Sequence, residues 1–165
     1  MSQERINKLL EETIKEVKSL GIPCSEEISP NVKINSRATS RFGCCVRYGS
    51  VEYRIELSKV MLQAADKLIK GTLAHEILHT CLGCMNHQKL WQTYANQMNE
   101  AFGYDIKRTS SAAEKGVQLH IKYKHMVVCP NCGQQFPKSR STNVTRHPEE
   151  YSCGNCGHSG LRLEY

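Results

Sequence analysis

Apolar residues recur at helical spacing over the first twenty positions of the chain. Between residues 2 and 20 they fall three or four positions apart and alternate with charged residues: Ile6, Leu9, Leu10, Ile14, Val17 and Leu20. This spacing places them on one face of an amphipathic helix. Gly21 and Pro23 follow, and both residue types are typical of a helix end. We predict a helix over 2–20 that covers the hydrophobic core.

A strand pattern follows between residues 32 and 58. Apolar side chains alternate with charged ones in Val51, Glu52, Tyr53, Arg54, Ile55, Glu56 and Leu57. Alternation of this kind is typical of a half-buried strand. Gly49-Ser50 suits the turn of a hairpin. We therefore predict a small, mixed or antiparallel sheet in this region.

Two more helices are predicted, one from about Ala64 through Leu78 and one from Gln88 to Phe102, where Gly103 ends it. The stretch KRTSSAAEKG that follows is small and polar, as linkers often are. We predict an α+β domain over 1–108, a linker over 109–122 and a cysteine-rich unit over 123–165.

Composition limits the class of protein. Hydrophobic residues make up 39% of the 165 positions and charged residues 23%, which is typical of a globular protein. The first residues form no continuous apolar run, so we expect neither a signal peptide nor a membrane span, and a cytoplasmic location. Nine cysteines in such a chain favour metal binding over disulfides. A net charge of +6 is compatible with a polyanionic partner.

His75, Glu76 and His79 form the pattern H-E-x-x-H within the predicted helix. Each helical residue advances by about 100°, so the two histidines lie about 40° apart and one turn along the axis. Both imidazoles can then bind one zinc ion, while Glu76 stands beside it as a general base for a water molecule.

Such a site needs a third protein ligand, and several residues compete for this position. On a continued helix Cys81 and Cys84 would lie about 200° and 140° from His79, so we interpret them as buried thiols. Glu100 falls opposite Trp91 on its own helix, and we expect it to point to solvent.

His87 is the remaining candidate for the third ligand. It follows Gly83 and Asn86, residue types that let a chain leave a helix and turn back. A return loop of this length would bring His87 over His79. We therefore favour His87.

The stretch HEILHTCLGCMNHQKLW (75–91) resembles the SprT-like zinc metalloproteases. Their pattern is H-E-x-x-H, a variable loop, and a histidine shortly before an aromatic residue in the next helix, here His75, Glu76, His79, His87 and Trp91. Residues 34–62 also resemble the strand region of that family. Gln88 departs from the glycine common there. The resemblance implies a zincin-like core, with the zinc on the three histidines and Glu76 as the catalytic base.

Four cysteines in the last third of the chain form two C-x-x-C pairs. They are Cys129, Cys132, Cys153 and Cys156. Thiolates at this spacing converge on one tetrahedral zinc ion. Because four protein ligands close the coordination shell, we predict a structural zinc ribbon here, and two zinc ions per chain in all.

The ribbon also carries a basic stretch. Residues 134–147 contain Lys138, Arg140 and Arg146 and no acidic residue. Phe136, Tyr123 and Tyr151 offer stacking faces for single-stranded nucleic acid. The alternative is a solvated loop whose aromatic side chains pack on the ribbon. In the related Spartan proteases a zinc-binding subdomain engages single-stranded DNA, and this resemblance modestly favours the nucleic-acid interpretation.

We expect a zinc-dependent endopeptidase that acts on proteins associated with nucleic acid, including proteins covalently trapped on DNA. The strand over 51–57, if it is an exposed edge, would align an extended substrate. The main alternative is a non-proteolytic nucleic-acid-binding or transcription-associated protein in which both zinc ions are structural. A hydrolase of small amides is a third. The sequence indicates neither the substrate protein nor the oligomeric state.

Overall fold

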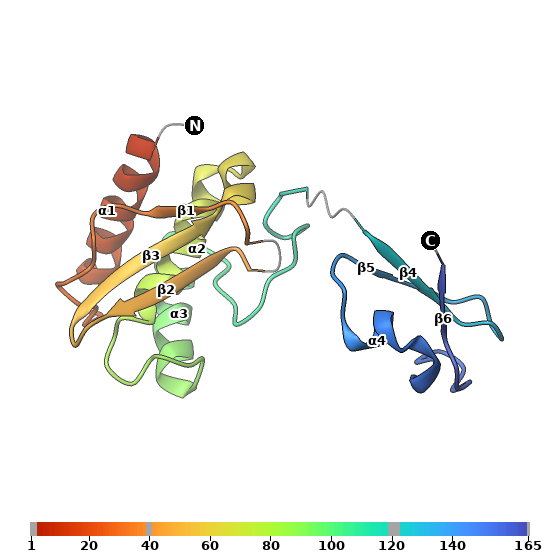
Figure 1. Ribbon diagram of the computed structural model, residues 1–165. Helices are drawn as coiled ribbons and strands as arrows, with labels where there is room; N and C mark the ends of the chain where they lie inside the picture. The colour runs from red at the N-terminus through yellow and green to blue at the C-terminus, as the bar shows by residue number, and fades with distance from the viewer. Residues whose placement is uncertain (1–2, 39–40, 119–122, 165) are drawn as a thin grey trace. The chain divides into compact units, whose positions relative to one another are not determined.

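The computed structural model describes residues 3–38, 41–118 and 123–164. The chain divides into two compact units, Met1–Leu119 and His120–Tyr165, and both can be followed in Figure 1. Each unit mixes helices with a small sheet, as the predicted α+β class requires. Within the described ranges no helix is long and apolar enough to cross a membrane.

The described residues of the N-terminal unit form three α-helices, three strands and one short 3-10 helix. In chain order they are α1 (Gln3–Ser19), β1 (Lys33–Asn35), β2 (Gly43–Tyr48), β3 (Glu52–Ser58), η1 (Lys59–Gln63), α2 (Asp66–Leu78) and α3 (Lys89–Phe102). Helix α1 buries Ile6, Leu10 and Val17 of the predicted face, whereas Leu20, also predicted there, lies beyond the helix end and is exposed.

Helix α2 lies at the centre of this unit. It contacts α1, α3, β2 and β3, and the sheet lies in front of α2 and α3 in the view of Figure 1. Ile69, Leu73 and Ile77 are fully buried, so α2 is enclosed by apolar side chains and its position is held tightly. Helix α3 ends at Gly103, whose φ of 64° is left-handed, as predicted for that end.

The three strands pair in the order β1-β3-β2. Strand β3 is parallel to β1 and antiparallel to β2, and the β2–β3 hairpin turns at Gly49, as predicted. The hypothesis that residues 51–57 form an exposed edge is wrong, because β3 is paired on both sides. The edge strands of this sheet are β1 and β2, and β2 is the one that contacts α2.

The segment after α3 differs from the predicted linker. Residues 109–118 belong to the N-terminal unit, where Lys115 and Val117 are buried and Ala112 packs against the core. Their small and polar composition resembles that of a linker, but the few apolar side chains anchor the segment. Residues 119–122 of the predicted linker lie outside the described residues.

The C-terminal unit contains β4 (His125–Val128), β5 (Gln135–Lys138), α4 (Asn143–Arg146), η2 (Pro148–Glu150) and β6 (Arg162–Glu164). Strand β4 is central and antiparallel to both β5 and β6. Among the described residues of this unit, the buried apolar cluster consists of Val127, Cys129, Cys153 and Leu161. Such a core is too small to hold a fold by apolar burial alone.

Candidate functional site

Three histidines from separate parts of the N-terminal unit meet at one point. His75 lies in the last turn of α2, His79 is the C-cap of that helix, and His87 lies in the loop before α3. One ligand nitrogen of each lies within 4.8 Å of the others. The Nε2 atoms of His75 and His87 are 2.9 Å apart, close to the roughly 3.3 Å expected for two nitrogens on one tetrahedral zinc ion. The group can therefore hold a metal ion.

The competing ligand candidates lie elsewhere. Glu100 is exposed, as predicted. Cys81 and Cys84 are buried in the core cluster, as predicted. Helix α2 ends at Leu78, however, and does not continue through the two cysteines, as their predicted angles from His79 had assumed. Within residues 41–118, none of these three side chains joins a group of candidate metal ligands.

Backbone groups orient two of the imidazoles. The Nδ1 atom of His79 lies 2.7 Å from the carbonyl oxygen of Cys84, and the backbone of Lys107 hydrogen-bonds with His75. A metal-binding histidine usually donates its second ring N–H to such a carbonyl, which fixes the tautomer and the ring orientation. Cys84 therefore contributes through its carbonyl group, a role that its side-chain type does not indicate.

Trp91 of α3 contacts all three histidines. Its ring centroid lies 4.7, 5.7 and 4.5 Å from those of His75, His79 and His87, and only 1% of the residue is exposed. The indole closes one side of the cluster. It limits the rotation of the imidazoles and keeps water from that side.

The three imidazoles are held in their neutral form. Burial, followed by the proximity of His79 and His87, lowers the pKa of His75 to about 3. Burial also lowers the pKa of His79 and of His87. A neutral imidazole presents the lone pair that a metal ion needs.

Glu76 lies one residue along α2 from His75 and faces strand β2. Only 7% of the residue is exposed. Burial raises the pKa of Glu76 to about 7, although a hydrogen bond with the backbone of Cys45 and the charges of Arg41 and Lys115 lower it. The backbone of Gly43 approaches this carboxyl group closely. No role was predicted for Gly43, although a glycine in a strand often marks such a close approach.

The four cysteines of the C-terminal unit form a second group of candidate metal ligands. The Sγ atoms of Cys129 and Cys156 are 3.6 Å apart, and those of Cys132 and Cys153 are 3.7 Å apart. These separations are far longer than a disulfide bond of about 2.05 Å. They match the roughly 3.8 Å expected for two thiolates on one tetrahedral zinc ion.

Tight turns build the two halves of this cysteine group. The N–H of Gly133 donates to the carbonyl of Cys129, and the N–H of Gly157 donates to that of Cys153. Both glycines have a φ of 73°, a backbone conformation that other residues rarely adopt. A backbone hydrogen bond with His158 lowers the pKa of Cys156 to about 6. This thiol is therefore ionised near neutral pH, as a metal ligand must be.

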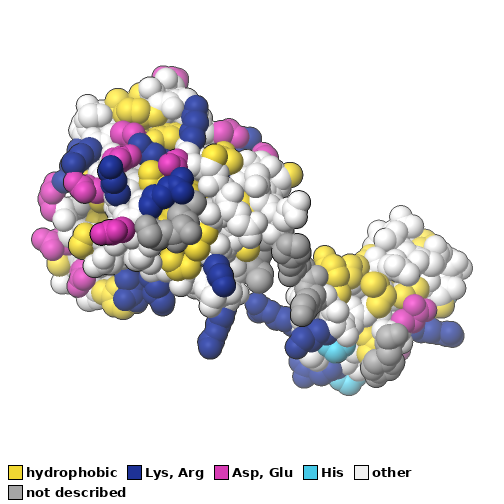
Figure 2. Space-filling model, turned by 90° about the horizontal axis from the view of Figure 1, so that it is seen from above, with side chains coloured by type: hydrophobic (Ala, Val, Ile, Leu, Met, Phe, Trp, Pro, Cys, Tyr) yellow, Lys and Arg dark blue, Asp and Glu magenta, His cyan; other side chains and the backbone are white. Residues whose placement is uncertain are grey.

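The residues predicted to bind nucleic acid lie in the same unit. Arg140 and Arg146 are exposed, and Lys138 of β5 is half-buried; Figure 2 shows Lys and Arg side chains on the surface of this unit. Phe136 packs against the buried cluster, so its ring is less available for stacking than predicted. Between residues 123 and 164, the exposed aromatic residues are Tyr123 and Tyr151.

Comparison with known proteins agrees with the resemblance of residues 75–91. The family model described as the SprT-like family matches residues 5–113. "Protein SprT-like" of Bacillus subtilis (strain 168) is 27% identical over 116 residues, which are 67% of this chain and 69% of that protein. The matched region contains the three histidines, Glu76 and the strands beside them. Because the family model covers more than half of the chain, the protein belongs to the SprT-like family.

Proposed function

We propose that this protein is a zinc-dependent endopeptidase whose active site is the histidine group of the N-terminal unit. The observation that carries the proposal is the convergence of His75, His79 and His87 next to the buried carboxyl group of Glu76. A purely structural metal site has no need of this carboxyl group.

The donor set fits zinc. His75, His79 and His87 supply neutral nitrogens within 4.8 Å of one another, and three protein ligands leave a fourth position for water or substrate. When bound, zinc supplies a Lewis acid that acidifies water and polarises the carbonyl group of a peptide. The carbonyl of Cys84 and the indole of Trp91 hold the imidazoles in place for this role.

Glu76 is the proposed general base. Its carboxylate accepts a proton from the attacking water and then carries this proton to the nitrogen of the leaving amine. Its burial between α2 and β2 keeps competing water away and fixes its orientation. The unpaired edge of β2, which begins at Gly43 beside Glu76, offers backbone groups to an extended substrate.

The cysteine group of the C-terminal unit is the proposed site of a second, structural zinc ion. Its four thiolates fill the coordination shell. We propose that the exposed Arg140, Arg146, Tyr123 and Tyr151 of this unit bind single-stranded DNA. Substrates would then be proteins bound to or trapped on DNA.

The test compares wild type with Glu76→Gln in a proteolysis assay on a DNA-bound protein, with and without single-stranded DNA. We expect Glu76→Gln to lower the rate by about a hundredfold or more, because the base is lost. The matched control is Glu100→Gln, which makes the same chemical change at an exposed position of α3. Metal analysis of all three proteins should show equal zinc content.

Two outcomes would decide against this function. Equal rates for wild type and Glu76→Gln would show that the carboxyl group takes no part. DNA binding without any cleavage by wild type would favour the alternative function, a nucleic-acid-binding protein whose metal ions are both structural.

A further inference from the structure

A cavity of about 260 Å³ opens beside the histidine group. Strand β2, helix α2 and the segment after α3 line it, and His75 and Glu76 form part of its wall. A ligand in this cavity would therefore lie next to the groups proposed to carry the reaction. Peptide substrate is the ligand that the proposed function places there.

The lining of the cavity is strongly basic. Arg41, Lys107, Arg108 and Lys115 contribute to it, and Glu76 is its one acidic residue. Lys107 is neutralised by ion pairs with Asp105 and Glu114, at 2.8 and 3.0 Å. Three cationic side chains remain to receive an anion.

Lys115 is the most informative of these. Only 8% of the residue is exposed. Its Nζ atom has no hydrogen-bond or ion-pair partner among residues 3–38, 41–118 and 123–164, although it lines the cavity. A buried ammonium group without a hydrogen-bonded partner is unfavourable, since it has lost part of its hydration, and the charges of Asp105, Glu114 and Glu76 replace only part of the opposite charge that it needs. A bound carboxylate would supply that charge.

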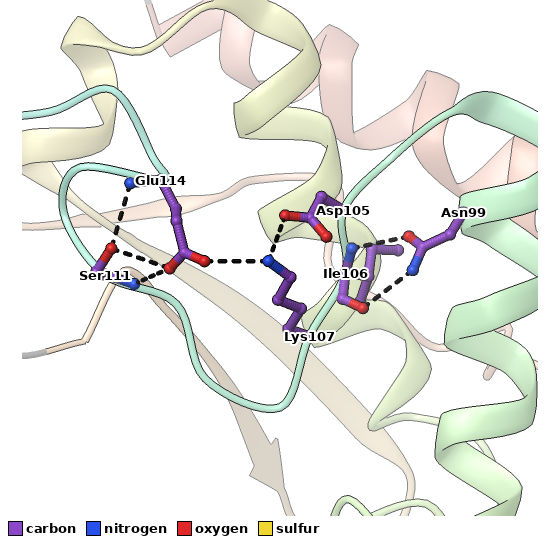
Figure 3. Close-up of polar contacts among 6 residues, drawn as sticks. All are labelled: Asn99, Asp105, Ile106, Lys107, Ser111 and Glu114. Carbon is purple, nitrogen blue, oxygen red and sulfur yellow. Dashed lines mark hydrogen bonds and ion pairs between the residues drawn. The ribbon is translucent and has the colours of Figure 1, made fainter.

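A network of polar contacts orders the residues that precede Lys115 (Figure 3). Ser111 donates to the Glu114 carboxylate from its backbone N–H, at 2.6 Å, and from its hydroxyl, at 2.9 Å. Lys107 joins Glu114 to Asp105. Asn99 of α3 makes two hydrogen bonds with the backbone of Ile106, at 2.7 and 3.1 Å. The segment is thus tied to α3, and the backbone that leads to Lys115 is ordered before substrate arrives.

We propose that this cavity is a subsite for a carboxylate group of the peptide substrate, bound by the buried Lys115 and the exposed Arg41 and Arg108. The proposal rests on the proposed function and gives it a specificity: cleavage next to an acidic side chain or near a free C-terminus. Both sources present the same carboxylate, and the experiment separates them.

The first experiment measures peptide cleavage by the full chain with zinc. A mixed peptide pool identifies a cleaved sequence, and this peptide is then compared with its Glu→Gln form and with its C-terminal amide. We expect kcat/KM to fall about tenfold or more for one of these, because a charge-assisted hydrogen bond is lost. A fall with Glu→Gln assigns the subsite to a side chain, and a fall with the amide assigns it to the C-terminus.

The same peptides are then cleaved by variants. We expect Lys115→Met and Arg108→Gln to cleave the charged and neutral peptides at similar rates. Lys115→Arg should keep part of the preference for the charged peptide. Lys59→Met is the matched control, because Lys59 is exposed in η1 and absent from the cavity lining. It should keep the full preference.

The second measurement does not depend on catalysis. Fluorescence anisotropy compares binding of the labelled charged and neutral peptides to Glu76→Gln and to Glu76→Gln with Lys115→Met. The charged peptide should bind about tenfold more tightly to the first protein only. If wild type cleaves no peptide, the proposed function fails, and the same binding measurement with a labelled glutamate-containing peptide pool and its Gln-containing, C-terminally amidated counterpart still decides the subsite.

Three results would overturn the subsite. The first is that wild type cleaves and binds the charged and neutral peptides equally well. The second is that Lys115→Met and Arg108→Gln still cleave the charged peptide faster, to the same extent as wild type. The third is that a thymidine oligonucleotide competes with the peptide and that Lys115→Met abolishes this competition. The last result would assign the cavity to a phosphate group.

Discussion

The backbone of Gly43 in β2 lies against the side chain of Glu76 in α2. A β-carbon at Gly43 would stand 2.6 Å from Oε1 of Glu76, 2.8 Å from its Cγ and 3.0 Å from its Cδ. Atoms do not approach this closely without a shift of one of them. The absence of a side chain at Gly43 therefore decides where the carboxyl group of Glu76 stands relative to the histidine group.

The variant Gly43→Ala should displace Glu76 and lower peptidase activity by about a hundredfold, because a shift of about 1 Å in a reacting group has effects of that order. Zinc content should not change, since the three histidines are untouched. The control is Gly71→Ala on α2, whose β-carbon would meet Tyr104 at an ordinary 3.8 Å. Full activity in Gly43→Ala would show that the close approach has no functional role.

Trp91 is the one tryptophan in the sequence, so intrinsic fluorescence should report metal binding at the histidine group. Its ring lies within 5.7 Å of all three imidazole centroids. We expect Co²⁺, which accepts the same nitrogen ligands, to quench this fluorescence in metal-free protein. His87→Ala should weaken the quenching, and Cys132→Ser should leave it unchanged. Unchanged quenching in His87→Ala would separate His87 from the metal site.

Removal of metal should affect the two units differently. The buried cluster of the C-terminal unit is small, so a strong chelator should unfold this unit. The N-terminal unit, with a much larger apolar core, should stay folded. Amide dispersion in NMR spectra distinguishes the two.

Cys132→Ser should reduce zinc from two ions per chain to one, whereas Cys44→Ser, outside both ligand groups, should keep both. Two zinc ions in Cys132→Ser would contradict the ribbon site.

Glu114 should give the segment 104–118 a pH-dependent stability. Hydrogen bonds with Ser111 and the charge of Lys107 lower the pKa of Glu114 to about 2, from an ordinary value of 4.5. Folding therefore favours the ionised form, so the stabilisation is complete above about pH 4.5 and is lost as the pH falls toward 2.

Hydrogen exchange of the segment, compared between wild type and Glu114→Gln at each pH, measures this effect. Wild type should exchange more slowly at pH 7 and 5, and the difference should vanish at lower pH. Glu11→Gln on α1, which loses an ion pair with Lys15, should leave the exchange of the segment unchanged. A difference as large at pH 2 as at pH 7 would rule out the carboxylate of Glu114 as its cause.

Features that depend on near neighbours along the chain could be predicted from the residues alone. Helix α1 and the end of α3 at Gly103 follow from spacing and residue type within a few positions. The H-E-x-x-H pattern brings His75 and His79 together through one helical turn, and each C-x-x-C pair needs only one tight turn. These contacts are local, so their residues carry enough information to predict them.

Contacts between distant segments could not be predicted in this way and became known from the fold. The alternation in β3 is compatible with an edge or a central strand, and pairing with both β1 and β2 settled its place. Residues 109–118 resemble a linker, yet they carry Lys115 to the cavity beside Glu76. Gly43 and Glu76 are far apart in the chain and meet because β2 packs on α2. Such contacts depend on how whole elements fit together, and no short stretch of sequence encodes that fit.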